Sequence, residues 1–143
     1  MRVYTNDNYN IKEPVIYCIM PTYARFVQKA ELTRQCSTFR NVKNLVWILV
    51  EDSVKKTDLV DSFLKSCPVK SVHLNATMSE PVKHGHRGVD QRNAGIAWVR
   101  THFMSDDTDN KNGVVYFSDD DNTYDPRIFD EVGNTFCSSV YIT

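Results

Sequence analysis

Runs of apolar residues alternate along the chain with segments of helical periodicity. Continuous apolar runs at 15–20, 45–50 and 114–117, and a shorter mixed run at 69–74, are typical of strands in a parallel sheet. Apolar residues recur at helical spacing in 24–39, 57–66 and 89–103, and Pro126 can begin a last helix through Val132. This order predicts an α/β fold, with a mainly parallel sheet, right-handed crossovers and helices on both faces.

Finer details of these elements also follow from the pattern. Pro21 and Thr22 are expected to end the first strand, and Thr57 is expected to cap the second helix. The first helix carries two neighbouring stripes, Phe26 with Ala30 and Thr33, and Leu32 with Cys36 and Phe39. The residues of the second helix expected to face inward are Leu59, Phe63 and Leu64.

An acidic segment follows the strand at 114–117, which the pattern predicts to be buried and central. It consists of Asp119, Asp120 and Asp121. Three adjacent carboxylates repel one another unless a cation or hydrogen-bond donors lie between them. Oxygen-only ligands suit a hard cation such as Mg²⁺ or Mn²⁺. From this segment alone, a metal site and a solvated acidic turn are equally good interpretations.

Two more strands are followed by side chains of chemical interest. Ligands of a parallel sheet bind beyond the carboxyl ends of its strands, where the sequence places Tyr23, Asp52 and the acidic segment. Tyr23 offers a ring face on which a base can stack, and Asp52 can accept a hydrogen bond from a base N–H. Taken singly, Tyr23 is a boundary aromatic and Asp52 is a loop carboxylate or helix cap. Their coincidence at one edge favours a nucleotide.

The start of the third helix carries two arginines that could meet an anion. Gly88 permits close backbone approach, and a helix start favours anions. Arg87 and Arg92 can therefore counter a phosphate or pair with the acidic segment. The alternative is that Asp90 and Arg92 are ordinary surface charges of a helix. The sequence has no G-x-G-x-x-G fingerprint and no Walker A motif, which excludes the dinucleotide and P-loop classes.

Length and charge narrow the function classes further. With 143 residues and a formal net charge of −1, the chain is expected to form one domain with no electrostatic footprint for nucleic acid. Residues 1–13 are polar, and we expect a flexible lead-in rather than a signal peptide.

The four cysteines have no CxxC spacing, which argues against zinc, and Cys18 falls in an apolar strand. The sequon Asn75-Ala76-Thr77 is compatible with a secretory route.

Four segments form a specific combination when taken in order. They are Pro21-Thr22-Tyr23-Ala24-Arg25 with Val27 to Leu32, then Val50-Glu51-Asp52, then Arg87-Gly88-Val89-Asp90-Gln91-Arg92-Asn93, then Val114 to Tyr124. Together they resemble the β-1,3-glucuronosyltransferases, most of all the glucuronosyltransferase I branch, which completes the proteoglycan linker tetrasaccharide. The resemblance implies a GT-A fold of Rossmann-like type. It also implies a lumenal position at the Golgi membrane and, for the full-length family member, a possible homodimer.

The chemistry is implied by the same resemblance. The donor would be UDP-glucuronic acid, the acceptor a galactose-terminated glycan and the metal Mn²⁺. Carried over residue by residue, Tyr23 would stack on uracil and Asp52 would form a hydrogen bond with it. The remaining donor contacts would be Arg87, Arg92, Asp119 and Asp120, and the metal ligand would be Asp121.

The resemblance covers part of the family's pattern. Residues 14–132 would form the donor-binding half, whereas 133–143 do not resemble the continuation that carries the acceptor site and the catalytic base. We nominate no base here, since Glu51 and Asp90 are better explained as a strand-end and a helix-start carboxylate. Two alternatives remain: a truncated, catalytically inactive fragment that binds UDP and Mn²⁺, and another UDP-sugar transferase with the same metal motif.

Overall fold

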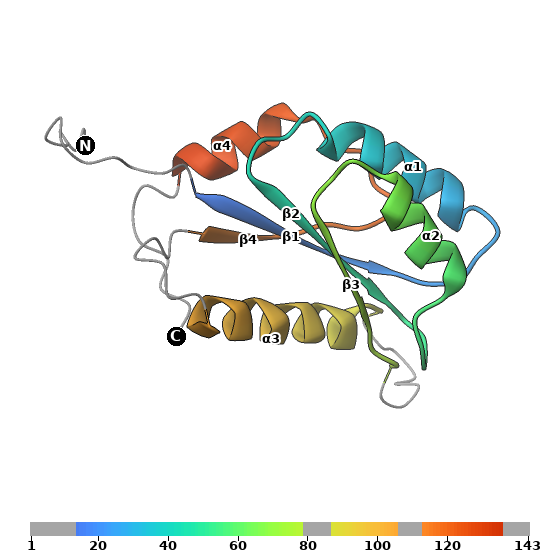
Figure 1. Ribbon diagram of the computed structural model, residues 1–143. Coiled ribbons are helices and arrows are strands. Elements are labelled where there is room, and N and C mark those ends of the chain that lie inside the picture. The colour runs from blue at the N-terminus through green and yellow to red at the C-terminus, as the bar shows by residue number, and fades with distance from the viewer. Residues whose placement is uncertain (1–13, 79–86, 106–112, 136–143) are drawn as a thin grey trace, which may run out of the picture.

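The structure, a computed structural model, describes residues 14–78, 87–105 and 113–135. Strands and helices alternate through these ranges as β1 Val15–Thr22, α1 Gln28–Phe39, β2 Leu45–Glu51, α2 Asp58–Ser66, β3 Ser71–Asn75, α3 Val89–Ser105, β4 Gly113–Phe117 and α4 Arg127–Thr135. The strands form one sheet in the order β3-β2-β1-β4, and every neighbouring pair is parallel (Figure 1). The predicted α/β fold with a Rossmann-like parallel sheet is confirmed.

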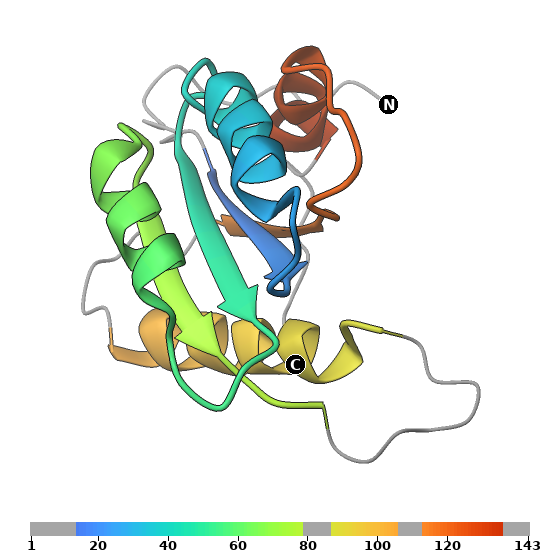
Figure 2. The same ribbon diagram turned by 90° about the vertical axis from the view of Figure 1, so that its right-hand side faces the viewer.

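Helices cover both faces of the sheet. One face is covered by α3, and the other by α1, α2 and α4 (Figures 1 and 2). Side chains of β1 alternate between the two sides: Cys18 and Met20 join the core under α1, α2 and α4, whereas Tyr17 and Ile19 join the core under α3. Because both faces of the central strands are buried, nearly every position in them is apolar.

β1 runs two residues further than predicted, through Pro21 and Thr22. Pairing of β1 with β4 ends at Ile19, and alternate residues of a parallel strand face opposite neighbours. The Thr22 carbonyl accepts the Asp52 N–H at 2.8 Å on the β2 side, so Pro21 faces the β4 side, beyond the last pair there. The missing N–H of Pro21 therefore costs the sheet no hydrogen bond, and the strand extends to the edge where ligands bind.

The structure confirms one of the two predicted stripes of α1, since Leu32 and Phe39 are buried and Cys36 packs against the same core. α1 begins at Gln28, and Phe26 is fully exposed in the preceding loop, so the stripe assigned to Phe26 is wrong. The buried residues of α1 are Gln28, Leu32, Gln35 and Phe39. In α2, Leu59 is 45% exposed and Val60 is buried in its place. The Thr57 side chain makes no cap hydrogen bond to α2.

β4 lies at an edge of the sheet within the described residues, and its prediction as a central buried strand is wrong. Val114 is buried, but Phe117 is 47% exposed. The edge position explains this exposure, since no further described strand or helix covers the far side of Phe117. The predicted lead-in 1–13 and most of the tail at 133–143 lie outside the described residues, and the domain boundaries stay predictions.

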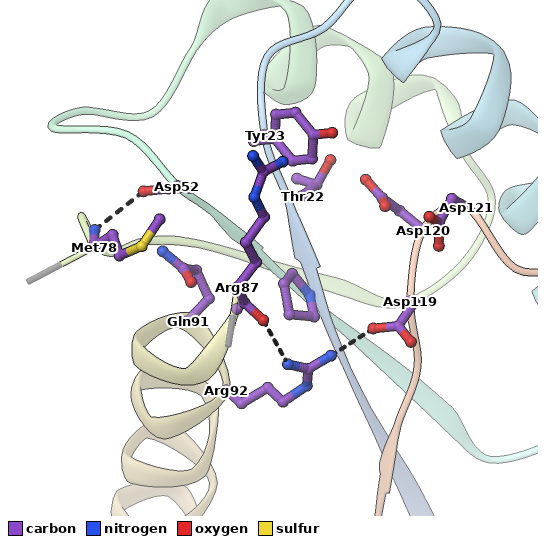
Figure 3. A pocket seen from close by; sticks show the side chains of 12 residues that line it. Thr22, Tyr23, Asp52, Met78, Arg87, Gln91, Arg92, Asp119, Asp120 and Asp121 are labelled. Atoms are coloured by element: carbon purple, nitrogen blue, oxygen red, sulfur yellow. Dashed lines mark hydrogen bonds and ion pairs between the residues drawn. The ribbon is translucent and has the colours of Figure 1, made fainter. Parts of the chain in front are cut away.

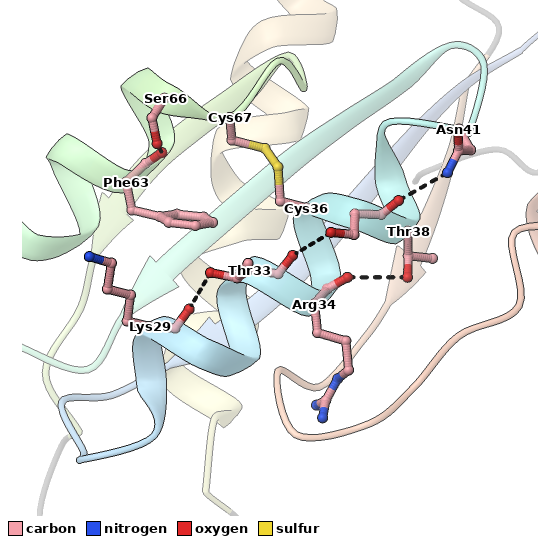
Figure 4. Close-up of a disulfide and its surroundings, with 10 residues drawn as sticks. Lys29, Thr33, Arg34, Cys36, Thr38, Asn41, Phe63, Ser66 and Cys67 are labelled. Atoms are coloured by element: carbon pink, nitrogen blue, oxygen red, sulfur yellow. Dashed lines mark hydrogen bonds between the residues drawn. A yellow bond between two sulfur atoms is a disulfide. The ribbon is translucent and has the colours of Figure 1, made fainter.

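A disulfide joins the end of α1 to the residue after α2. It links Cys36 to Cys67, whose Cα atoms are 6.2 Å apart (Figure 4). Cys18 is buried, as predicted, and burial raises the pKa of its thiol to about 12. Among the helices that the structure describes, none has the length and apolar character needed to cross a bilayer.

Candidate functional site

A cavity of about 540 Å³ opens at the carboxyl edge of the sheet, between the ends of β1, β2 and β4 and the start of α3 (Figure 3). All seven residues nominated from the sequence line it: Tyr23, Asp52, Arg87, Arg92, Asp119, Asp120 and Asp121. The other lining residues are Pro21, Thr22, Met78, Gly88 and Gln91. Parallel strands explain this gathering, because each one delivers the residues that follow it to the same edge.

Tyr23 directly follows β1 and is 41% exposed. Two guanidinium groups lie over its ring: the Cζ atom of Arg25 is 4.4 Å from the ring centroid, and that of Arg87 is 5.9 Å away. Arg87 lines the cavity and extends toward Tyr23 in Figure 3, whereas Arg25 is not a cavity residue. The ring is thus an aromatic surface at the cavity wall, next to positive charge, and it suits a flat base attached to an anionic group.

Asp52 follows β2 and has one carboxyl oxygen available. Its Oδ1 accepts the backbone N–H of Met78 at 3.1 Å, and its own N–H is held by Thr22. Oδ2 has no hydrogen-bond partner among the described residues. The side chain is therefore fixed in direction and can still accept a hydrogen bond from a ligand in the cavity.

Glu51 precedes Asp52 and is buried and committed to other partners. Its Oε1 accepts the Thr57 hydroxyl at 2.6 Å, and its Oε2 accepts the Thr57 backbone N–H at 2.9 Å. Oε2 also lies 2.6 Å from His73 Nε2 on β3. These bonds tie the end of β2 to the start of α2 and to β3, and they brace the loop that carries Asp52. This position agrees with the interpretation of Glu51 as a strand-end carboxylate.

Two glycines allow α3 to approach β1 closely. Gly88 has a φ of +86°, and a Cβ atom there would lie 2.8 Å from Arg92 Nη1 and 3.1 Å from Pro21 Cγ. At Gly95, a Cβ atom would lie 2.6 Å from Ile19 Cγ2. Gly95 has no room for a side chain, and at Gly88 the positive φ and the Pro21 contact disfavour one, so glycine at both positions lets the start of α3 lie against the end of β1. This contact brings Arg87 and Arg92 to the cavity.

Arg92 pairs with the first residue of the acidic segment. Its Nη2 donates to Asp119 Oδ1 at 2.5 Å, and its Nη1 donates to the Arg87 carbonyl at 3.1 Å (Figure 3). The backbone N–H of Asp119 donates to the Tyr124 hydroxyl oxygen at 2.7 Å. Of the roles considered for Arg92, the structure therefore shows the pairing with the acidic segment. The pair joins α3 to the turn after β4 across one side of the cavity.

Asp120 is the buried member of the acidic segment, with 6% exposure. Its Oδ2 accepts Arg25 Nη1 at 2.8 Å, and its carbonyl oxygen accepts Gln35 Nε2 and Arg34 Nη2 from α1, both at 3.2 Å. The hydrogen bond with Asp120, the largest contribution, raises the pKa of the Arg25 guanidinium above its ordinary value. Asp120 therefore connects the acidic segment to Arg25 and to α1.

Asp121 differs from its two neighbours because its carboxylate is exposed and has no hydrogen-bond or ion-pair partner among the described residues. It lines the cavity. No group of three or more His, Cys, Asp and Glu side chains able to hold a metal ion occurs in the described part of the chain, so a cation here needs further ligands. Hard divalent cations commonly bind through one or two carboxylates together with phosphate oxygens and water. The donor set fits such a cation bound with a phosphorylated ligand.

Comparison with known families gives the family of this chain. The model of glycosyltransferase family 43 matches residues 35–142. This chain belongs to glycosyltransferase family 43. The match extends past the boundary predicted at residue 133, which nevertheless stays a prediction.

Three curated relatives share the β-glucuronosyltransferase name. Galactosylgalactosylxylosylprotein 3-beta-glucuronosyltransferase 2 of Mus musculus is 45% identical over 130 residues, which cover 90% of this chain and 40% of the relative. The protein of the same name designated sqv-8 from Caenorhabditis elegans is 41% identical, covering 86% and 36%. The one designated 1 from Rattus norvegicus is 40% identical, covering 90% and 40%. The chain thus spans about two-fifths of the length of the curated relatives it matches.

Sequence reasoning missed three contributors to the site. Gln91 is buried, lines the cavity and donates from Nε2 to the Ala76 carbonyl at 2.7 Å. Met78 supplies the N–H that holds Asp52. Arg25 is 95 positions from its partner Asp120. Each of these roles depends on a contact with a residue elsewhere in the chain. The only signal in the sequence was the expectation that the acidic segment needs cations or donors, which was assigned to Arg87 and Arg92 and not to Arg25.

Proposed function

We propose that this chain binds UDP-glucuronic acid as the donor for transfer of glucuronic acid, with inversion, to a terminal galactose in proteoglycan linker biosynthesis. The observation that carries the proposal is the meeting of an aromatic ring, an available hydrogen-bond acceptor, two arginines and an unpaired carboxylate around one cavity. Support for the sugar and for the acceptor comes from the names of the relatives, which specify glucuronosyl transfer to a galactosylgalactosylxylosyl protein.

The uridine part of the donor would lie at the β1 and β2 side of the cavity. The Tyr23 ring would stack on uracil, and Asp52 Oδ2 would accept a base N–H. Asp119 and Asp120 would help hold the nucleoside from the opposite wall, with their carboxylates fixed by Arg92 and Arg25. Base stacking of this kind contributes about 1–3 kcal/mol.

The diphosphate would lie between the start of α3 and the acidic segment. Arg87 and the first N–H groups of α3 would meet its negative charge. Asp121 would hold Mn²⁺ together with oxygens of the diphosphate, because it is the one carboxylate of the acidic segment without a partner among the described residues. When bound, the ion would neutralise the charge that develops on the departing UDP.

The Cys36–Cys67 disulfide supports a position in an oxidising compartment, such as the lumen of the Golgi. The family's lumenal attachment to the Golgi membrane and a homodimer of the full-length protein belong to the same proposal.

Isothermal titration of this chain with UDP-glucuronic acid, UDP-galactose and UDP-N-acetylglucosamine, with and without Mn²⁺, tests the proposal. We expect UDP-glucuronic acid to bind most tightly and every UDP compound to require the metal. Asp121→Asn should remove the metal dependence, whereas Asp58→Asn, an exposed acid at the start of α2, should leave it unchanged. Equal affinity in the presence of a chelator would refute the metal site, and preference for another sugar would favour a different UDP-sugar transferase.

A further inference from the structure

One guanidinium group outside the cavity contacts three parts of the candidate site. Arg25 lies in the loop between β1 and α1, and its side chain is 15% exposed. Its Nη1 donates to Asp120 Oδ2 at 2.8 Å and to the Tyr23 carbonyl at 3.4 Å, and its Nη2 pairs with Glu31 in the first turn of α1. Arg25 therefore connects the end of β1, the acidic segment and α1.

The contact with Tyr23 affects the ring that would receive a base. The Arg25 Cζ atom lies 4.4 Å from the ring centroid, close enough for a cation–π interaction. Because Arg25 does not line the cavity while Tyr23 does, the Arg25 guanidinium contacts the ring from outside the cavity, whereas Arg87, which lines the cavity, lies 5.9 Å from the same ring centroid. A planar guanidinium held by two carboxylates has little freedom to turn, so it also restricts the orientation of the ring.

The contact with Asp120 affects the position of Asp121. Burying a carboxylate is costly unless it is paired and hydrogen-bonded, and Arg25 is the ion-pair partner of the buried Asp120. Arg34 and Gln35 of α1 also donate hydrogen bonds to the Asp120 carbonyl oxygen. The middle of the acidic segment is therefore fixed to α1, and this determines where the next residue, the exposed Asp121, lies in the cavity.

We propose that Arg25 is a positioning residue that holds the base-stacking ring and the cation-binding carboxylate in one fixed relation. The two ends of a nucleoside diphosphate, its base and its metal-bound phosphates, are then recognised together. This inference rests on the proposed function and adds to it a residue that lies outside the cavity and acts through Tyr23 and Asp120.

Two binding measurements separate the two contacts. The affinity of uridine without metal reports on the Tyr23 ring, and the ratio of UDP affinities with and without Mn²⁺ reports on the acidic segment. For Arg25→Ala we expect uridine affinity to fall about two- to fivefold, the size of an exposed cation–π contact. We expect the Mn²⁺-dependent gain to fall about 10- to 100-fold, as for other residues that orient metal ligands.

Arg25→Lys distinguishes positioning from a general effect on folding. Lysine keeps a charge beside Asp120 but cannot stack a planar group on the ring while pairing with two carboxylates. It should restore most of the Mn²⁺-dependent gain and leave uridine binding weak. Arg127→Ala is the matched control, because Arg127 pairs with Asp125 on the surface and does not line the cavity. It should change neither measurement.

Each outcome of these titrations is informative. If the wild-type chain binds UDP, and Arg25→Ala has the same uridine affinity and the same Mn²⁺-dependent gain as the wild type, Arg25 has no positioning role and the proposed function still stands. If the wild-type chain binds no UDP, the proposed function fails and this inference fails with it. If Arg25→Ala does not fold in a thermal melt, Arg25→Lys decides: wild-type uridine affinity in that variant would overturn the inference.

Discussion

Removing the Cys36–Cys67 disulfide should lower the free energy of unfolding by about 3.7 kcal/mol. The bridge closes a loop between residues separated by 31 positions, and closing a loop of this length restricts the unfolded chain by that amount at room temperature in the chain-entropy model. A domain of this size is stable by about 5–15 kcal/mol in total. The bridge therefore supplies a large share of the stability, although it does not touch the cavity (Figure 4).

Urea unfolding followed by tryptophan fluorescence measures this effect. The oxidised wild type is compared with the reduced wild type and with Cys36→Ala/Cys67→Ala, and UDP affinity is measured on the same samples in the absence of urea. We expect both altered forms to unfold at lower urea with an unchanged UDP affinity. A loss below about 1 kcal/mol would refute the entropic argument, since that is within the range of an ordinary surface change. A loss of UDP binding by folded samples would show instead that the bridge shapes the site.

Other predictions concern single residues. Tyr23→Ala should weaken uridine binding by about 1–3 kcal/mol in a titration, and Tyr23→Phe should not. Gly88→Ala should cost about 1–2 kcal/mol in urea unfolding because of its positive φ, whereas Gly133→Ala, with open space around it, should cost nothing. In a Cys137→Ser background, Cys18 should react with a thiol reagent only after unfolding. Incubation with UDP-glucuronic acid, Mn²⁺ and a galactosyl-galactose acceptor should yield little transfer product by mass spectrometry.

The order of elements could be predicted from the sequence because the two central strands are buried on both faces. A continuous apolar run such as 45–50 is then visible without any alignment. The inward face of α1 could not be predicted in the same way, since Gln28 and Gln35 are two of its buried residues. Gln28 donates to the Thr22 hydroxyl at 3.1 Å and Gln35 to the Asp120 carbonyl, and hydrophobic periodicity does not detect inward polar residues that are satisfied by distant partners.

The members of the candidate site were predictable for a different reason. Tyr23, Asp52 and the acidic segment each follow a strand, and a parallel sheet brings such residues to one edge whatever lies between them. Pairing of Arg92 with the acidic segment was one of the two roles predicted for it, and its partner is Asp119. The pairs of Arg25 with Asp120 and of Glu51 with His73, separated by 95 and 22 positions, were not predictable. No local pattern marks such partners, and the same holds for the choice of Cys67 as the partner of Cys36.

These pairings bear on the catalytic base, which an inverting transfer needs in order to take the proton of the acceptor hydroxyl. Among the described residues, four carboxylates line the cavity: Asp52, Asp119, Asp120 and Asp121. Asp119 and Asp120 are each engaged in an ion pair with an arginine. Asp52 is fixed by Met78 at the proposed uracil position, and Asp121 is the proposed metal ligand. In the proposed function all four bind or position the donor, and the base is therefore expected to come from residues other than these four.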